Sequence, residues 1–183
     1  TAFICALGDD AAGRFLHSIA SGESLDLAGI HIAQTEPTGR ALIVVDDSGE
    51  NSIIVVPGSN AACPPATNIG PSDVVLAQLE IPISAVADSF IAAREAGATT
   101  ILNPAPAVEL SAELLSLCDI VIPNEHEIEL LGGVSRLQGA GVRTVIVTKG
   151  AAGIDIYNEG VREQLPSFRV TPVDTTGAGD AFC

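Results

Sequence analysis

The stretch VVLAQLEIPISAVADSFIAAREAGATTILN, residues 74–103, holds two short apolar runs separated by a segment with helical periodicity. Residues 74–79 and 99–102 are rich in Val, Leu, Ile and Thr, a composition that favours β-strands. Between them, residues 82–96 repeat apolar side chains at helical spacing and are followed by Gly97, a typical helix stop. The apolar positions are Ile83, Val86, Ala87, Phe90 and Ile91. A strand, a helix and a second strand in succession predict a unit with two parallel strands.

The same alternation extends along the chain on both sides of this stretch. We expect helices over residues 111–117 and 125–131, and strands over residues 119–122 and 144–147. Near-continuous aliphatic strands that alternate with amphipathic helices are typical of a covered parallel sheet. The sequence therefore predicts an α/β fold, with a predominantly parallel sheet flanked by helices on both faces.

Residues 41–56 interrupt this alternation. Two β-branched runs, ALIVV (residues 41–45) and SIIVV (residues 52–56), are separated only by DDSGEN, which has the composition of a turn. We predict a β-hairpin here that leaves the main sheet. The predicted organisation is an α/β core of residues 1–34 and 58–183, incomplete at both ends, with residues 35–57 forming the hairpin.

Composition and charge exclude several classes of protein. Hydrophobic residues make up 47% of the 183 residues and charged residues 17%, which is enough to bury a core. The net charge of −15 argues against binding to nucleic acid or an anionic membrane. The cysteines are too far apart for a metal motif or a disulfide framework, and we read them as free thiols. They are Cys5, Cys63, Cys118 and Cys183. We expect a cytoplasmic protein.

Polar residues stand at or just beyond the carboxyl ends of four successive predicted strands. They are Glu80, Asn103, Asn124 and Thr148. A single polar residue in such a place is most often a helix cap, and each of these alone could be one. In open parallel sheets, however, ligands bind beyond the carboxyl ends of the strands. Four such residues along one edge predict a long polar crevice.

The last residues, TTGAGDAFC (175–183), place glycines and then Asp180 at the start of a segment that can begin a helix. Unobstructed backbone N–H groups at such a turn attract an anion. The chain has only eight Lys and Arg residues, so a phosphate would be held largely by backbone groups and a metal. A carboxylate beside an anion hole fits phosphoryl transfer to an alcohol. A tight loop with an acidic first helical turn remains the alternative.

Taken together, four segments resemble the ribokinase-like (PfkB) carbohydrate kinases. DTTGAGDAF (residues 174–182) resembles the family signature, and NPAPA (103–107), PNEHE (123–127) and TKGAAG (148–153) follow its order and approximate spacing. The resemblance covers nearly the whole chain. It implies a ribokinase-like fold with a small β-lid, and an ATP-dependent kinase that phosphorylates a sugar, with D-ribose the best match.

The resemblance assigns the chemistry to the last segment. Asp180 would be the general base that takes the proton from the terminal hydroxyl of the bound sugar. Gly177, Ala178 and Gly179 would form the anion hole for the transferring phosphoryl group. The sugar and ATP are the implied partners, and no nucleic acid or membrane is expected.

The resemblance also implies sites for Mg²⁺ and ATP. Asn124 and Glu127 match an N-x-x-E motif associated with Mg²⁺ and phosphate placement, and their spacing puts both on one face of a helix. Thr148, Gly150 and Gly153 match the loop that embraces ATP. An acidic helical turn that only complements the helix dipole is the alternative for Glu127.

Three further expectations come from the resemblance. Glu80 matches an acidic residue that contacts sugar hydroxyls. Asp174, with the backbone carbonyl of Thr176, matches a site for K⁺ that activates many members, although Asp174 could equally be a turn residue after Pro172. The hairpin of residues 41–56 would belong to the lid and form a homodimer interface.

The chain departs from the family pattern in ways that bear on its activity. The amino-terminal sugar-binding segment and the helices after the signature are absent from it, and between Leu131 and Val142 a full helix is replaced by GGVSRLQGAG. We therefore expect a piece of a larger kinase. The alternatives are another sugar or nucleoside kinase, acting on 2-keto-3-deoxygluconate, fructose or adenosine, and a non-catalytic fragment that binds a nucleotide or sugar.

Overall fold

The computed structural model of the protein describes residues 1–45, 51–171 and 177–183. They form two compact units: residues 1–66 with 80–85, and residues 67–79 with 86–183. No helix in these described ranges combines the length and the apolar character needed to cross a membrane.

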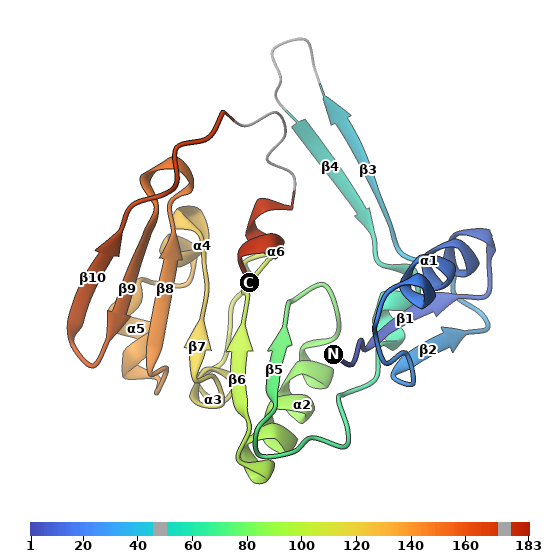
Figure 1. The fold of residues 1–183 in the computed structure, drawn as a ribbon, viewed down its shortest axis with the longest axis horizontal. Coiled ribbons are helices and arrows are strands. Elements are labelled where there is room, and N and C mark those ends of the chain that lie inside the picture. The colour runs from blue at the N-terminus through green and yellow to red at the C-terminus, as the bar shows by residue number, and fades with distance from the viewer. Residues whose placement is uncertain (46–50, 172–176) are drawn as a thin grey trace. The chain divides into compact units, whose positions relative to one another are not determined.

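The second unit is built on a six-stranded sheet with the order β10-β9-β8-β7-β6-β5 (Figure 1). Its strands are β5 (Val74–Ala77), β6 (Thr99–Leu102), β7 (Ile120–Val121), β8 (Thr144–Thr148), β9 (Ile154–Asn158) and β10 (Val161–Leu165). From β5 to β8 all neighbours are parallel, whereas β9 and β10 are antiparallel to their neighbours. The predicted α/β class with a predominantly parallel sheet is confirmed.

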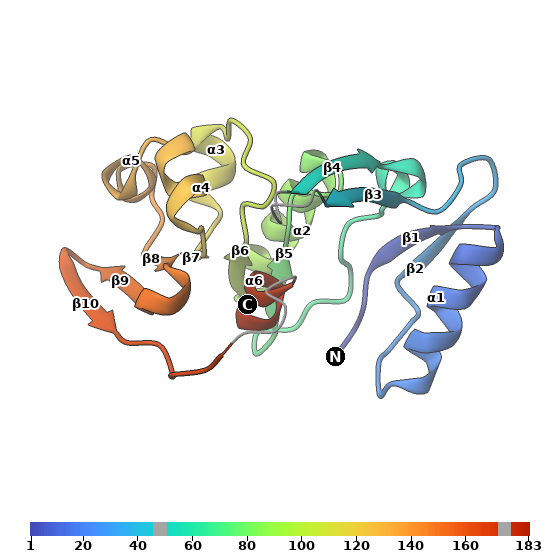
Figure 2. The same cartoon turned by 90° about the horizontal axis from the view of Figure 1, so that it is seen from above.

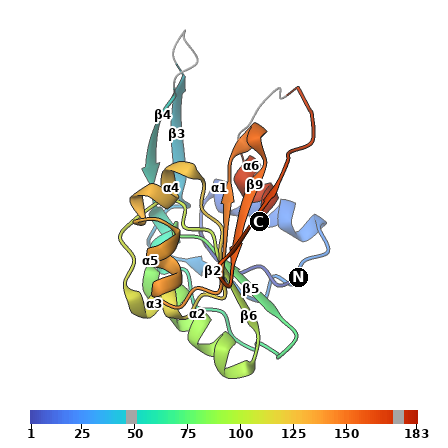
Figure 3. The ribbon, with the colours of Figure 1, turned by 90° about the vertical axis from the view of Figure 1, so that its left-hand side faces the viewer.

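The order of the strands explains where the helices of this unit lie. Each parallel strand is added on the same side of the previous one, so right-handed crossovers place the connecting helices on one face of the sheet. Figures 2 and 3 show α2 to α5 on that face and α6 on the opposite side. These helices are α2 (Ile83–Ala96), α3 (Ala112–Ser116), α4 (Glu125–Leu130), α5 (Val134–Gly139) and α6 (Ala178–Phe182).

Helix α2 buries a narrower stripe than its periodicity indicated. Val86, Phe90 and Ala93 have no exposed surface, and they share one face at i, i+4 and i+7. Ile83 and Ile91, which were predicted on the buried face, are each 44% exposed. The stripe is centred between Val86 and Ala93, so Ile91 falls on its flank, and Ile83 stands in the first turn of the helix.

The antiparallel pair β9–β10 and helix α5 were not predicted. The pair is joined by Glu159 and Gly160, which both have positive φ, +48° and +80°, as tight hairpin turns of the primed type require. The sequence did not indicate this turn, because Glu159 stands where Asn or Asp typically precedes the glycine. Helix α5, with Leu137 buried, occupies the connection between Leu131 and Val142 where a full helix was expected to be lacking.

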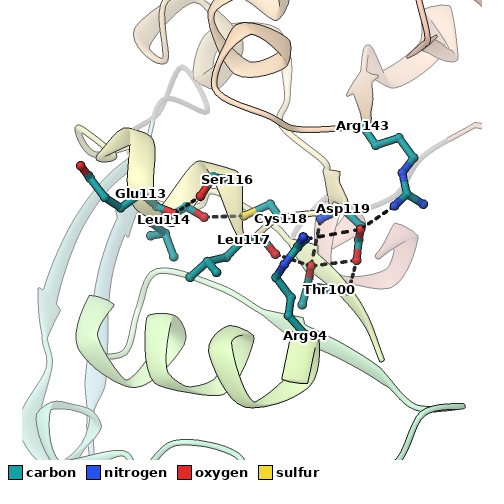
Figure 4. Close-up of polar contacts among 9 residues, drawn as sticks. All are labelled: Arg94, Thr100, Glu113, Leu114, Ser116, Leu117, Cys118, Asp119 and Arg143. Atoms are coloured by element: carbon teal, nitrogen blue, oxygen red, sulfur yellow. Dashed lines mark hydrogen bonds and ion pairs between the residues drawn. The ribbon is translucent and has the colours of Figure 1, made fainter. Parts of the chain in front are cut away.

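A polar cluster joins the amino ends of the central strands (Figure 4). Asp119 Oδ2 accepts hydrogen bonds from the backbone N–H of Thr100 (3.0 Å) and lies 3.1 Å from its hydroxyl, which also donates to the Leu117 carbonyl at 2.6 Å. Asp119 Oδ1 pairs with Arg143 at 3.2 Å and Arg94 at 3.9 Å. Since Thr100 is fully buried, these bonds satisfy polar groups that water cannot reach.

The first unit contains a small parallel sheet and a hairpin. Its elements are β1 (Cys5–Gly8), α1 (Ala11–Gly22), β2 (Ile30–Ala33), β3 (Arg40–Val45), β4 (Asn51–Val56) and the 3₁₀ turn η1 (Gly58–Ala62). Strands β1 and β2 are parallel. Asp10 caps α1: its carboxylate accepts from the Gly13 N–H at 2.7 Å and from the Thr38 hydroxyl at 2.7 Å. These hydrogen bonds hold the pKa of Asp10 far below its usual range.

Helix α1 does not bury the face that its sequence indicated. Phe15, Leu16 and Ile19 are 63%, 45% and 50% exposed, whereas Gly13 is buried. A Cβ atom at Gly13 would collide with the Gly8 carbonyl oxygen. Helix α1 therefore contacts β1 through a close approach of the two backbones at Gly13, and not through an apolar stripe.

The predicted hairpin is present as the antiparallel pair β3–β4. Of its predicted turn, residues 46–51, the first five lie outside the described residues, and Asn51 begins β4. The pair is apolar on both faces, because consecutive residues of a strand point to opposite faces and consecutive residues here are exposed aliphatic side chains. Those with 54–62% exposure are Leu42, Ile43, Val44, Ile53, Ile54 and Val55.

Candidate functional site

A pocket lies at the carboxyl ends of β6, β7 and β8, where it is closed by α6. Its lining residues all belong to the second unit: Asn103, Ala105, Ile122, Asn124, Glu127, Thr148, Gly177, Ala178, Gly179, Asp180 and Cys183. Three of the four polar residues predicted to line a crevice, Asn103, Asn124 and Thr148, therefore meet here. Segments up to about eighty residues apart along the chain are brought together because parallel strands present their carboxyl ends at one edge.

Asn124 and Glu127 form a reciprocal cap at the start of α4. The Asn124 side-chain oxygen accepts from the Glu127 N–H at 2.8 Å, and Glu127 Oε2 accepts from the Asn124 N–H at 2.8 Å. Two backbone donors that an open helix start would leave unpaired are thus satisfied. The cap uses one of the two carboxylate oxygens of Glu127, so capping and ligand binding are compatible in this residue.

Asp180 lies in the first turn of α6, directly after the glycine segment. Gly177 precedes this helix with φ of +71°, a left-handed conformation in which glycine is favoured. The side-chain amide of Gln78, just beyond the end of β5, donates from Nε2 to Asp180 Oδ1 at 2.9 Å. Sequence reasoning missed Gln78, although its polar side chain at the end of an apolar strand was a signal.

Asn103 holds the far end of α6. Its Nδ2 atom lies 3.3 Å from the Cys183 sulfur, and Asn103 is only 6% exposed. Burial raises the pKa of the Cys183 thiol, and the hydrogen bond from Asn103 only partly offsets this. The thiol is therefore neutral at physiological pH and adds no charge to the pocket.

The turn between β8 and β9, with its 3₁₀ segment η2 (Gly150–Ala152), meets the pocket only at Thr148. Thr148 pairs with Asn124 in a parallel bridge. Gly150 and Gly153 do not line the pocket. Gly153 has φ of +91°, and a Cβ atom there would collide with the Leu165 carbonyl oxygen, so no other residue fits.

The remaining predicted site residues are not placed in this pocket. Glu80 is exposed and belongs to the first unit, and its sugar contact stays a prediction. Asp174 and Thr176, the predicted K⁺ ligands, lie outside the described residues.

The charges of the pocket bear on which ligands it can hold. Glu127 and Asp180 contribute carboxylates, and none of the Lys or Arg residues that the structure describes lines it. Among the described residues, no cluster of three or more His, Cys, Asp or Glu could by itself hold a metal ion. This donor set fits Mg²⁺, which usually keeps several waters and takes one or two carboxylates together with substrate phosphates.

Comparison with known proteins agrees with this geometry. Residues 1–183 match the family described as pfkB family carbohydrate kinase. The chain belongs to that family. It is 38% identical over 199 residues to a ribokinase of Haemophilus influenzae, covering 99% of this chain and 65% of that protein. It is 35% identical over 200 residues to a ribokinase of Staphylococcus aureus, covering 100% of this chain and 66% of that protein.

A solved structure supports the family and its fold. The structure of Arabidopsis thaliana ribokinase complexed with ribose and ATP superposes with a TM-score of 0.86 at 30% identity. The alignment covers all of this chain and 66% of that one. The pfkB-family chain thus spans about two thirds of the length of these relatives, and the predicted ribokinase-like fold is confirmed.

Proposed function

We propose that the protein is an ATP-dependent kinase that converts D-ribose to D-ribose 5-phosphate. The observation that carries the proposal is the pocket in which Asp180 and the glycines at the start of α6, Gly177 and Gly179, lie beside Asn124 and Glu127. This arrangement combines a carboxylate base, backbone donors for an anion and a carboxylate for a metal in one place. The identity to ribokinases over nearly the whole chain supports D-ribose as the sugar.

In the proposed reaction, the carboxylate of Asp180 takes the proton from the terminal hydroxyl of the sugar. The hydroxyl oxygen forms a bond to the γ-phosphorus of ATP while the bond from that phosphorus to the bridging oxygen breaks, and ADP leaves with the electron pair. Backbone N–H groups of residues 177–179 hold the transferring phosphoryl group. The amide of Gln78, which donates to Asp180 Oδ1, keeps the carboxylate oriented.

Cofactor binding is part of the same proposal. When bound, Mg²⁺ neutralises charge on the phosphates. Asn124 and Glu127 would position it through water or phosphate, and the turn Thr148–Gly153 would receive ATP. Activation by K⁺ at Asp174 and the carbonyl of Thr176 is proposed from the resemblance of DTTGAGDAF to the family signature.

The hairpin β3–β4 is proposed as a lid that also forms a homodimer interface. Its aliphatic side chains are exposed on both faces, and a ribbon with two apolar faces can cover a ligand with one and meet a partner with the other. Glu80 is proposed to contact sugar hydroxyls. We further propose that the enzyme acts in the cytoplasm.

Release of ADP by the full-length gene product, measured with ribose, deoxyribose, fructose, 2-keto-3-deoxygluconate and adenosine and with and without K⁺, tests this function. We expect the highest kcat/KM for ribose. Asp180→Asn should lower kcat by about a thousandfold, within the range attributed to a general base, while ribose binding measured by calorimetry persists. Unchanged turnover in Asp180→Asn would exclude Asp180 as the base, and preference for another acceptor would replace ribose.

A further inference from the structure

A buried carboxylate lies directly behind the turn that joins β8 to β9. The side chain of Asp155, on β9 opposite Val147 of β8, is only 3% exposed. Its Oδ2 atom accepts from Lys149 Nζ at 3.0 Å and from Arg162 Nη2 at 2.9 Å. Among the described residues, its buried Oδ1 atom has no hydrogen-bond donor.

Stability alone does not explain this ion cluster. Removing a carboxylate from water is costly, and well-packed apolar residues in the place of a buried ion pair are often as stable or more stable. The partly paired state of Asp155, with Oδ1 unbonded, adds to that cost. The hydrogen bond from Lys149, together with the one from Arg162, nevertheless holds the pKa of Asp155 below its usual range. The carboxylate is therefore ionised, and it acts as a fixed anchor for its two cationic partners.

Lys149 connects this anchor to the turn. Its backbone N–H donates to the Gly153 carbonyl at 2.9 Å, and its carbonyl accepts from Ala152 at 3.0 Å. The main chain of Lys149 thus closes the turn while its side chain, 22% exposed, reaches back to Asp155. Lys149 also directly follows Thr148, which lines the pocket. A displacement of Lys149 would consequently move both the turn and the pocket wall.

The turn is also held by contacts at Ala151 and Gly153, whereas its backbone is open at Gly150. The Ser167 hydroxyl donates to the Ala151 carbonyl at 2.6 Å, and Gly153 packs against the carbonyl of Leu165. At Gly150, by contrast, no described residue other than its neighbours along the chain comes within 4 Å of where a Cβ would stand. The turn therefore presents an unobstructed backbone at Gly150 while its base is held by residues of β9 and of the segment after β10.

We propose that Asp155 is a positioning residue for the nucleotide: through Lys149 it holds the turn Thr148–Gly153 in the conformation that receives ATP. This inference rests on the proposed function, which makes that turn the nucleotide loop. Asp155 itself does not touch the substrate. Two other roles are distinguishable from this one: the cluster could serve folding only, or Lys149 could bind the phosphates directly, with Asp155 as its competitor.

The test compares Asp155→Asn, Lys149→Met and the double variant with the wild-type full-length gene product. Steady-state KM for ATP, KM for ribose and kcat are measured, together with binding of a fluorescent ATP analogue without sugar. Asp119→Asn is the matched control, because Asp119 also pairs with two basic residues but lies at the opposite end of β8, where Thr144 N–H donates to its carbonyl at 3.0 Å.

We expect both single variants to raise KM for ATP and to weaken analogue binding by about tenfold, the loss of one charge-assisted hydrogen bond. KM for ribose and kcat should change by no more than about twofold, because the turn is proposed to bind ATP equally well in the ground state and in the transition state. The double variant should be no worse than the poorer single variant, because the two residues act as one unit. Asp119→Asn should lower the thermal midpoint and leave KM for ATP unchanged.

Three results would overturn the proposal. Unchanged ATP binding in Asp155→Asn would reduce the cluster to a folding role. Weaker binding in Lys149→Met with equal or tighter binding in Asp155→Asn would make Lys149 a direct phosphate ligand. If Asp155→Asn fails to fold, Lys149→Met and Arg162→Gln are compared instead. Additive losses of ATP-analogue binding in these two variants, together with a parallel rise in KM for ribose, would contradict a specific effect on the turn. A wild-type protein that binds no ATP analogue would instead remove the proposed function itself.

Discussion

Gln78 Nε2 donates a hydrogen bond of 2.9 Å to Oδ1 of Asp180, so the end of β5 is tied to the first turn of α6. The two residues are far apart along the chain and meet because α6 closes the pocket at the carboxyl edge of the sheet. A side-chain amide is not basic, so Gln78 can orient Asp180 without competing for the substrate proton in the proposed role of Asp180 as the base.

Gln78→Leu should therefore reduce catalysis without preventing binding. We expect kcat to fall by about tenfold, the loss of one hydrogen bond to a charged group, with KM for ribose and for ATP nearly unchanged. Gln164→Leu is the control, because Gln164 is an exposed glutamine on β10. Equal kcat in both variants would show that the hydrogen bond from Gln78 has no part in orienting Asp180.

Glu127 caps α4 and is also proposed to help to bind Mg²⁺, and one substitution can distinguish these two roles. Gln can replace Glu in a capping box, so Glu127→Gln should leave the unfolding free energy almost unchanged while it raises the Mg²⁺ concentration required for half-maximal activity. Asn124→Ala should instead cost about 1 kcal/mol of stability, as the loss of a helix cap usually does. Urea unfolding and Mg²⁺ titration of activity measure the two effects. If Glu127→Gln does not alter the Mg²⁺ dependence of activity, Glu127 only caps the helix and has no part in Mg²⁺ binding.

The site could be predicted from the sequence as far as it depends on local rules. The sequence indicates Asn103, Asn124 and Thr148 because each lies at or just beyond the end of a recognisable strand, and Asp180 because it follows a glycine turn. Gln78 and Asp155 were not found. Gln78, just beyond β5, meets Asp180 far along the chain, and Asp155, within β9, meets Lys149 across a turn. The sequence marks such residues as polar but does not show which partner they meet.

The fold was predictable to a similar extent and for a similar reason. Periodicity identified the helices and parallel strands, because an α/β chain repeats its local pattern. It did not identify the buried face of α1. In α2 it identified Val86 and Phe90 correctly but also placed the exposed Ile83 and Ile91 on the buried face. In α1 a glycine contact decides which face is buried, and at Gly13 the deciding feature is the absence of a side chain, which no hydrophobic pattern records.

The residues of the cluster around Asp119 should contribute unequally to the stability of the protein. Asp119→Ala should lower the unfolding free energy by about 2 kcal/mol, because it removes charge-assisted hydrogen bonds and leaves the buried Thr100 N–H unpaired. Arg94→Ala and Arg143→Ala should each cost below about 1 kcal/mol, since their side chains are 48% and 67% exposed and surface ion pairs are weak. Urea unfolding measures all three, and an arginine variant as costly as Asp119→Ala would contradict this ranking.

The Cys118 thiol should be inert in the folded protein and should destabilise it in alkali. Burial raises the pKa of Cys118 from the ordinary 9.0 to about 12, and its thiol lies 3.3 Å from the Leu114 carbonyl as a donor (Figure 4). The folded state thus favours the protonated thiol, a contribution that is complete below pH 9.0 and is lost as the pH rises towards about 12.

Alkylation followed by mass spectrometry should find Cys118 unmodified at neutral pH until urea unfolds the chain. Urea unfolding at several alkaline pH values should show a steeper loss of stability in the wild type than in Cys118→Ala. Rapid labelling of Cys118 under native conditions, or identical pH profiles of the two proteins, would contradict a buried, protonated thiol.

The exposed aliphatic residues of β3 and β4 should mediate self-association. Ile43 and Ile53 face each other across the hairpin and are each 54% exposed, and burial of that exposed half at an interface contributes roughly 1 kcal/mol for each side chain. Ile53→Lys should therefore weaken the proposed homodimer by at least about tenfold in Kd. Sedimentation velocity of the full-length gene product at several concentrations measures this. Val161→Lys on β10, where Val161 is 68% exposed, is the control with the same change of charge, and a wild-type protein that sediments as a monomer at every concentration would rule out the dimer.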